Sequence, residues 1–495
     1  MNALESPQTT NTSRQRALAL LQQHGRHATS FQLLEDGINH WFDRQDEDDL
    51  AVIGYVLQGN YRIVVGIPVA DDAHASIATA RFIREARSQK HNVLFFSADQ
   101  QFIEKLETNL DDLSFDLIKI GEQPEWTPDE YSTVGASRRS LRSQINRAKN
   151  KGVSTRRVDD SESMAPGSPT RKALAEVLDA WKSSRRMSVM GFMVDVQPFE
   201  LIAERRFYIA ESLGEPVAFL SAVPIFKTNG WFFEDVIRRP DAPNGTTELL
   251  IDAAMRDAAK EGSDFVTLGL SPLAGVTTGP GPHRGIRGIL RLCYTRLSPL
   301  YGFSSLRSFK ARFHPDRWSN QYLVTVPNSV GIRALMAVLS AFAGGNMPRF
   351  ALDTCERLLL RVPHGFWALA LLLLGGLLIP WTLLLASLDG NVWFGDGAVQ
   401  WAWVGLDAFI ATAMLTLSGL VWRGQRNLQR LNKGLIALTT LNLIFAISHA
   451  IWMHHLLVGW LTMGFAIALA GPLLATLLLG ILGTVMQRTP QNEPI

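Results

Sequence analysis

The sequence predicts an α/β fold with mixed sheets, arranged as two similar lobes and followed by an all-α four-helix transmembrane region. Two contrasts along the chain lead to this prediction. The first two-thirds alternate short β-branched or aromatic runs with helical periodicity, whereas the last third is dominated by Leu, Ala, Gly, Ile and Trp. At 495 residues the chain is long enough for more than one domain.

The first two-thirds are predicted to hold a flexible N-terminus and both α/β lobes. Residues 1–30 begin with a polar stretch that lacks the apolar core of a signal peptide. The β-branched runs at 51–57 and 61–69 flank Gln58-Gly59-Asn60, a pattern typical of a hairpin. We place the first lobe at 31–158, a Pro/Gly/Ser-rich linker at 159–170 and the second lobe at 171–323.

Four apolar stretches follow a predicted juxtamembrane connector at 324–364 and place transmembrane helices within 365–486. Each stretch is close to or above the about 20 helical residues that cross a hydrocarbon layer of ~30 Å. They are Gly365–Leu388, Gln400–Trp422, Gly434–Trp452 and Val458–Met486. Lys and Arg gather before the first span, in the second loop and after the last span, so the positive-inside rule predicts cytosolic termini.

Two ionisable residues lie inside the predicted spans. Asp407 is in the second span and His449 is in the third. A charge at this depth is expensive, so such a residue either serves a function or extends toward the interface. Because His449 is close to Trp452, we favour the interfacial interpretation for it. Both interpretations stay open for Asp407.

The clearest charge feature is a basic tract between Arg138 and Arg157, which holds eight Lys or Arg residues and no acid. Such a tract binds phosphates, either in nucleic acid or in anionic lipid head groups. A solvated helix face is the plain structural alternative, and charge alone does not separate the two ligands. The candidate residues for binding nucleic acid or anionic head groups are Arg138, Arg139, Arg142, Arg147, Lys149 and Lys151.

Cofactor and metal signatures are missing from the sequence. The two cysteines, Cys293 and Cys355, form neither a disulfide framework nor a metal-ligand pattern, and they suit a reducing compartment. No Walker loop, dinucleotide fingerprint or GxSxG elbow is present. We therefore expect no cofactor and no metal.

Several strings occur in an order and spacing that identify a family resemblance. They are Ile118-Lys119-Ile120-Gly121-Glu122, Asp235-Val-Ile-Arg238, Asp241-Ala-Pro-Asn-Gly245, Leu268-Gly269-Leu-Ser-Pro272 and Leu306-Arg307-Ser-Phe309-Lys310-Ala-Arg312. Over about residues 31–323 the chain resembles the catalytic domain of the lysyl-phosphatidylglycerol synthases, the multiple peptide resistance factors. Members of that family usually carry many spans before this domain, whereas here four predicted spans follow it.

The resemblance implies a tandem GNAT-like fold and a membrane-bound aminoacyltransferase of the bacterial inner membrane. The implied reaction moves an amino acid from aminoacyl-tRNA to the hydroxyl of a lipid such as phosphatidylglycerol. The implied partners are aminoacyl-tRNA, a membrane phospholipid and the bilayer. The amino acid, the acceptor lipid, lipid flipping and the oligomeric state stay open.

The resemblance also implies a set of site residues. Asp235 and Arg238 correspond to the family's Asp-x-x-Arg pair, and Lys310 corresponds to the lysine of its Phe-Lys motif. We expect Asp235 to hold the α-ammonium or act as a base, and the two cations to hold phosphate or stabilise the oxyanion. A salt bridge between Asp235 and Arg238 is the structural alternative. The substrate-binding candidates are Glu234, Gly269, Ser271, Arg307 and Arg312.

Two other functions compete with this one. An acyl-CoA-dependent GNAT N-acyltransferase normally needs a glycine-rich pyrophosphate loop at a helix start, and only Pro243-Asn244-Gly245 partly fits. A membrane-tethered binding module without activity is the non-enzymatic alternative, although the motif residues at 235, 238 and 310 argue against it.

Overall fold

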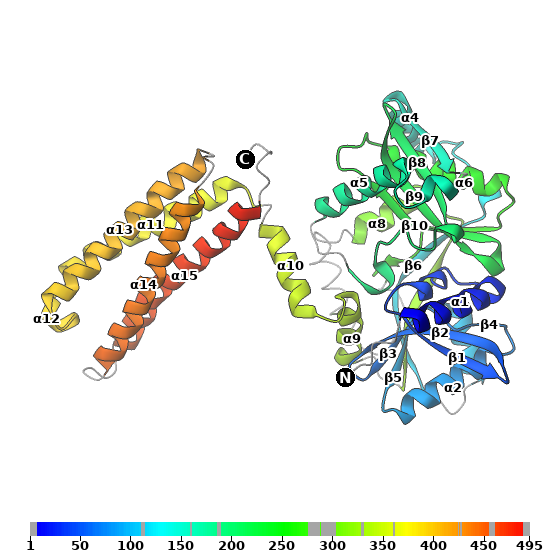
Figure 1. Cartoon of the computed structure of the whole chain (residues 1–495), viewed down its shortest axis with the longest axis horizontal. Coiled ribbons are helices and arrows are strands. Elements are labelled where there is room, and N and C mark those ends of the chain that lie inside the picture. Colours follow the sequence, from blue (N-terminus) through cyan, green and yellow to red (C-terminus); the bar gives the residue numbers. More distant parts are fainter. Residues whose placement is uncertain are drawn as a thin grey trace. The chain divides into compact units, whose positions relative to one another are not determined.

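A computed structural model describes residues 7–109, 114–158, 161–185, 190–275, 288, 303–327, 331–359, 362–423, 425, 428–454 and 461–488 (Figure 1). The chain divides into two compact units, Met1–Ala351 and Leu352–Ile495. The first unit is α/β and the second is helical, as the sequence predicts.

The first unit is built on one mixed sheet. Its main path runs β1-β2-β3-β5-β13-β6-β11-β10-β9-β8-β7, while β4 pairs with β2 and β12 pairs with β6. The strands are β1 (Asn39–Gln45), β2 (Asp48–Gln58), β3 (Tyr61–Val65), β4 (Val69–Ala70), β5 (Asn92–Ala98), β6 (Asp116–Trp126), β7 (Val153–Val158), β8 (Arg206–Ser212), β9 (Glu215–Ile225), β10 (Gly230–Arg238), β11 (Phe265–Thr267), β12 (Ser271–Pro272) and β13 (Arg317–Val326). The predicted hairpin is confirmed, because β2 pairs antiparallel with β3.

Helices cover both faces of this sheet. The described helices are α1 (Pro7–His24), α2 (Ala75–Ser88), α3 (Gln100–Asn109), α4 (Arg139–Asn150), α5 (Pro169–Ser184), α6 (Thr246–Lys260), α8 (Phe303–Ala311) and α9 (Ile332–Phe342), with α10 (Met347–Leu359) across the division between the units. One face carries α1, α5, α9 and the short helices η1 (Phe31–Leu34) and η4 (Phe192–Val194). The other face carries α2, α3, α4 and α6. We call these the α5 face and the α6 face.

The two halves of the sheet exchange elements, so the predicted lobe boundaries at 158 and 323 need correction. Strand β7 pairs with β8, and α4 packs Leu141, Ile145 and Ala148 into the core of the second half. In return, β13 lies between β5 and β6. An unpaired strand edge is unfavourable. Strand β13 pairs with both β5 and β6, although strands β7 to β12 separate it from them in the sequence.

The predicted flexible N-terminus is also corrected within the described residues. Helix α1 buries Ala17, Leu20 and Leu21 in the core of the α5 face. The predicted connector is structured in part, since α9 buries Ala334 and Val338 in the same core. Apolar spacing at three to four residues explains both cases, because it gives a helix one continuous face to bury.

The second unit is a bundle of long apolar helices. Its elements are α11 (His364–Ser387), α12 (Gly390–Trp393), α13 (Gly397–Trp422), α14 (Gln429–His454) and α15 (Leu461–Arg488). Among the described residues, three segments are long and apolar enough to cross a membrane, namely Gly365–Ser387, Gly397–Trp422 and Gln429–His449. The fourth predicted span overlaps α15, and its first residues, 458–460, lie outside the described residues.

The open question about Asp407 is answered by packing. Its side chain is buried and accepts a hydrogen bond from Asn442 Nδ2 at 2.7 Å, so α13 and α14 are joined by a polar contact. Interhelical hydrogen bonds of this kind stabilise helix pairs in membranes. The interfacial interpretation is therefore wrong for Asp407. The His449 ring packs between the rings of Phe394 and Trp403 at centroid distances of 5.7 and 5.9 Å.

Candidate active site

The candidate site begins with a β-bulge in β10. The register against β9 shifts between Phe233 and Asp235, so Glu234 is the extra residue. A bulge places two consecutive side chains on the same side of a strand, which regular alternation never does. Here it directs both Glu234 and Asp235 to the α5 face.

The packing of the neighbouring residues confirms this assignment of faces. Phe233 and Val236 pack in the core under α4 and α6, whereas Ile237 packs against α5. Alternation from Ile237 therefore puts Arg238 on the α6 face, opposite Asp235. The two residues of the Asp-x-x-Arg pair therefore lie on opposite faces of the sheet, because the strand continues through Arg238 instead of turning.

Arg205, which precedes β8, compensates part of the acidic charge. Its Nη1 lies 2.5 Å from Glu234 Oε2 and 3.0 Å from Ser221 Oγ, and its guanidinium lies over the Phe31 ring. Both side chains of this ion pair are nearly buried, at 6% and 11% exposure. Asp235, by contrast, forms no ion pair or hydrogen bond within the described part of the chain, although it is only 7% exposed.

Burial shifts the acidities of the carboxyl groups here. It raises the pKa of Asp235 to about 8, and the charge of Glu234 adds to the increase. Burial also raises the pKa of Glu35, with further contributions from Glu234 and Asp195. Glu35 follows η1 and Asp195 follows η4, so four acids from three segments share one electrostatic environment. We call Glu35, Asp195, Glu234 and Asp235 the acidic cluster.

Lys310 lies in a second buried polar position. Its Nζ donates to the carbonyl oxygens of Gly269 and Leu270, both at 2.9 Å, and thereby fixes the turn between β11 and β12. Burial lowers its pKa to about 7. Within the described residues no contact joins Lys310 to Asp235, so the structure does not bring these two predicted residues together.

The turn held by Lys310 contains two further predicted residues. Gly269 has a φ of +70°, and a Cβ there would lie 2.5 Å from the Phe232 ring, so only glycine fits. Ser271 is fully buried, and its Oγ has no hydrogen-bond partner among the described residues. An unsatisfied buried hydroxyl costs free energy, which makes this turn a candidate contact for a substrate.

The remaining predicted substrate-binding residues have protein partners. Arg307 pairs with Glu122 at 2.9 Å and lies over the Trp318 ring, and Lys119 Nζ lies 2.9 Å from the same carboxylate. Arg312 pairs with Glu248 at 3.1 Å. Among them only Glu234 belongs to the acidic cluster.

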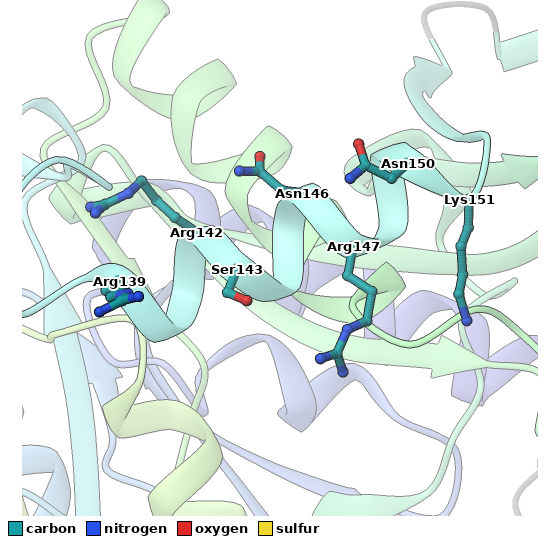
Figure 2. A pocket seen from close by; sticks show the side chains of 7 residues that line it. All are labelled: Arg139, Arg142, Ser143, Asn146, Arg147, Asn150 and Lys151. Atoms are coloured by element: carbon teal, nitrogen blue, oxygen red, sulfur yellow. The ribbon is translucent and has the colours of Figure 1, made fainter.

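Most of the basic tract lies on or beside helix α4, whereas Arg156 and Arg157 belong to β7; Figure 2 shows the outward side of α4. An open depression of about 540 Å³ is lined by Arg139, Arg142, Ser143, Asn146, Arg147, Asn150 and Lys151. Arg138 and Arg142 donate to loop carbonyls of Ser132, Thr133 and Gly135. Arg139, Arg147, Lys149 and Lys151 have no ion-pair partner within the described chain, so these cations remain available.

Sequence reasoning missed Glu35, Asp195 and Arg205. Each lies outside the recognised strings, and nothing in their local sequence connects them to β10. One signal was available: two adjacent acids, Glu234 and Asp235, stand between apolar residues of a strand. Such a pair fits a buried strand only when a bulge or a cationic partner is present.

A mixed sheet with a buried acidic site, joined to helices of membrane-spanning length, defines a membrane-associated protein of the α/β class. Residues 18–325 match the family described as phosphatidylglycerol lysyltransferase, C-terminal. The chain therefore belongs to this family, and the resemblance predicted from the sequence is confirmed.

Individual relatives agree with this assignment. The chain is 26% identical over 313 residues to a phosphatidylglycerol lysyltransferase of Bacillus subtilis, covering 62% of this chain and 34% of that protein. It is 22% identical over 296 residues to the protein of the same name from Staphylococcus xylosus, covering 59% and 33%. The chain thus spans about a third of the length of these curated relatives.

Two solved structures share the fold. The C-terminal domain of a putative lysylphosphatidylglycerol synthetase from Agrobacterium fabrum has a TM-score of 0.57 at 20% identity, covering 68% of this chain and 99% of that one. L-PGS from Bacillus licheniformis has a TM-score of 0.54 at 20% identity, covering 68% and 97%. The predicted α/β class with a mixed sheet, followed by a helical region, is confirmed.

Proposed function

We propose that this protein is a membrane-bound aminoacyltransferase that moves an amino acid from aminoacyl-tRNA to the hydroxyl of a lipid such as phosphatidylglycerol. In this reaction the ester bond to the tRNA ribose breaks and an ester bond to the lipid forms, while the lipid hydroxyl proton passes to the ribose oxygen. The donor ester is already activated, so no covalent nucleophile is needed.

The observation that carries the proposal is the buried Asp235, which has no ion-pair or hydrogen-bond partner among the described residues. Burial and the charge of Glu234 raise its pKa to about 8 against the opposing charges of Arg205 and Lys182, so its carboxylate lacks a directly paired cation in the described part of the chain. The α-ammonium of an aminoacyl ester supplies that cation. Asp195 adds negative charge nearby, while Arg205 holds Glu234 in place.

Lys310 acts in this proposal through the turn at 269–270. In the protonated form of Lys310, two of the three N–H donors hold carbonyl oxygens. The third is left to stabilise the oxygen of a substrate, and removal of one well-aimed donor typically costs about 3–4 kcal/mol in transition-state binding. Arg238 does not share this site and, if it binds phosphate, does so on the α6 face.

The cations on the outward side of α4 support aminoacyl-tRNA as the donor. The unpaired cations of α4 alternate with Ser143, Asn146 and Asn150, and hydroxyl and amide groups are common phosphate and sugar ligands in nucleic-acid complexes. This side presents no large apolar side chain, which a membrane-surface helix would need. Nucleic acid is therefore the favoured ligand of α4.

Replacing Arg139, Arg147 and Lys151 together by Gln is expected to weaken binding of the donor and to reduce its salt dependence. Each lost phosphate contact lowers the slope of log K against log salt by roughly 0.7–0.9. Filter binding of aminoacyl-tRNA at several salt concentrations measures the slope. The matched control is Arg156→Gln, because that residue already pairs with Glu211. An unchanged slope in the triple variant would contradict the assignment of α4.

The reaction itself is tested with the full chain in vesicles that contain phosphatidylglycerol. With aminoacyl-tRNA present, mass spectrometry should detect an aminoacylated lipid, and prior digestion of the tRNA should abolish it. A product formed from acyl-CoA instead would favour the N-acyltransferase. The absence of product with every donor would support the inactive binding module.

We also propose the bacterial inner membrane as the location, with both ends of the chain in the cytosol. The cationic loops support this orientation. It puts the α/β unit on the side where aminoacyl-tRNA is made.

A further inference from the structure

Helix α9 exposes large apolar residues, although it lies at the surface of the α/β unit. Among its eleven residues it has one charge, Arg333, and one hydroxyl, Ser340, which donates to Gln58 Oε1 at 2.9 Å. A surface helix of a soluble domain normally turns a polar face outward. Helix α9 lies beyond residue 325, where the family match ends, so the family does not explain it.

The inner side of α9 is firmly seated. Ala334, Ala337, Val338 and Ala341 are buried in the core of the α5 face. The Phe342 ring contacts the rings of Phe96 and Phe192 at centroid distances of 5.2 and 5.4 Å, and the Phe342 carbonyl accepts from Gly191 N–H. Because these contacts fix its rotation, α9 cannot bury its outer side by turning.

The outer side of α9 exposes three large apolar residues in a row. Ile332, Met336 and Leu339 are 62%, 48% and 47% exposed, at the spacing of one helical stripe. The other exposed large apolar residues described up to Ala351 stand elsewhere in the sequence, at Leu57, Ile77, Val134 and Leu213. A contiguous stripe of this kind marks an interaction site.

We propose that the outer side of α9 inserts into the lipid–water interface and seats the α/β unit on the bilayer. Only residues 343–364 separate α9 from the first apolar helical segment at Gly365, so the helix is tethered close to a membrane. Arg333 on the same helix and Arg349 on α10 are both exposed, and their charges suit anionic head groups. An amphipathic or apolar helix at an interface buries its apolar side about 5–10 Å deep.

A second copy of the chain fits the stripe less well than a bilayer does. A stable protein interface buries on the order of 1,000 Å² or more, and three partly exposed side chains on one short helix supply only a fraction of that area. Insertion into a bilayer needs no such minimum buried area, because the spanning helices already hold the protein at the membrane. Seating by α9 is independent of the donor and of the transfer reaction.

Site-directed fluorescence on the full chain tests the proposal. In a background with Cys293→Ser and Cys355→Ser, Met336→Cys is labelled with bimane and the protein is placed in phosphatidylglycerol/phosphatidylethanolamine vesicles. The emission of a label inserted in the bilayer should shift to the blue, and lipids brominated on their acyl chains should quench it. The matched control is Leu213→Cys, a 96% exposed residue between β8 and β9, whose label should stay unquenched.

The outcomes are distinct and need no enzymatic activity. Equal, weak quenching at both positions overturns the proposal. A label at 336 that is shielded in a concentration-dependent way, without quenching by brominated lipid, overturns it in favour of an interface between copies. As a second variant, Met336→Glu should abolish quenching of a label at Leu339→Cys, while Leu213→Glu leaves that quenching unchanged.

Discussion

Asp235→Asn is expected to lower kcat/KM for aminoacyl transfer by roughly 10²–10³-fold, the range typical for loss of one key electrostatic contact. The change keeps size and polarity but removes the negative charge that we propose holds the α-ammonium. Product formation in phosphatidylglycerol vesicles measures the effect. The protein should still accumulate in the membrane, because Asn fits the same buried position.

The matched control for this variant is Asp241→Asn. Asp241 follows the same strand, but its side chain is 70% exposed and pairs with Arg239 alone among the described residues. We expect nearly unchanged activity there. Equal activity of both variants would remove Asp235 from the site.

The pH profile gives a second readout of the same residue. The free carboxyl has a pKa of about 8, so it is mostly protonated at pH 6 and ammonium binding must displace its proton. Affinity for the donor should therefore rise between pH 6 and 8, until the substrate ammonium itself loses its proton. Asp235→Asn should lack this rise.

The free energy of unfolding should fall over the pH range in which affinity for the donor rises. Because folding raises this pKa, the folded state holds the proton more tightly, and the resulting stability is lost as pH rises from about 4 toward 8.

Arg205→Met is expected to destabilise the α/β unit by about 3–5 kcal/mol, the usual cost of removing one partner from a buried ion pair. The variant leaves Glu234 charged, nearly buried and close to Asp235 and Glu35, with no nearby guanidinium. Thermal or denaturant unfolding of the detergent-solubilised chain measures the loss. The double variant Arg205→Met with Glu234→Gln should recover much of it, because the uncompensated charge is gone.

An exposed pair close to the same strand provides the comparison. Arg239 and Asp241 lie 3.1 Å apart at 39% and 70% exposure. Exposed pairs contribute only about 0–1 kcal/mol, so Arg239→Met should have little effect. If both arginine variants lose the same small amount, Arg205 does not compensate the acidic cluster.

The location of the site illustrates how far local sequence reasoning extends. The strings around Asp235 and Lys310 identified the family, and the hairpin pattern predicted β2 and β3 at nearly the observed positions. Each of these inferences depends on neighbours within a few residues. The direction of the Asp235 side chain depends on the bulge in β10, which is defined by the pairing of β10 with β9. The register of that pairing depends on the packing of the whole core.

The sequence by itself determined that this chain has an α/β part followed by apolar helices, and it determined the family. The lengths of apolar stretches, their periodicity and the order of motifs are properties of the linear chain, so the sequence alone is enough to recognise them. Only the tertiary structure decided that Arg238 lies opposite Asp235, that Glu35, Asp195 and Arg205 join the site, and that α4 and β13 change halves. These features arise from strand pairing and burial between distant segments, which local propensity does not encode.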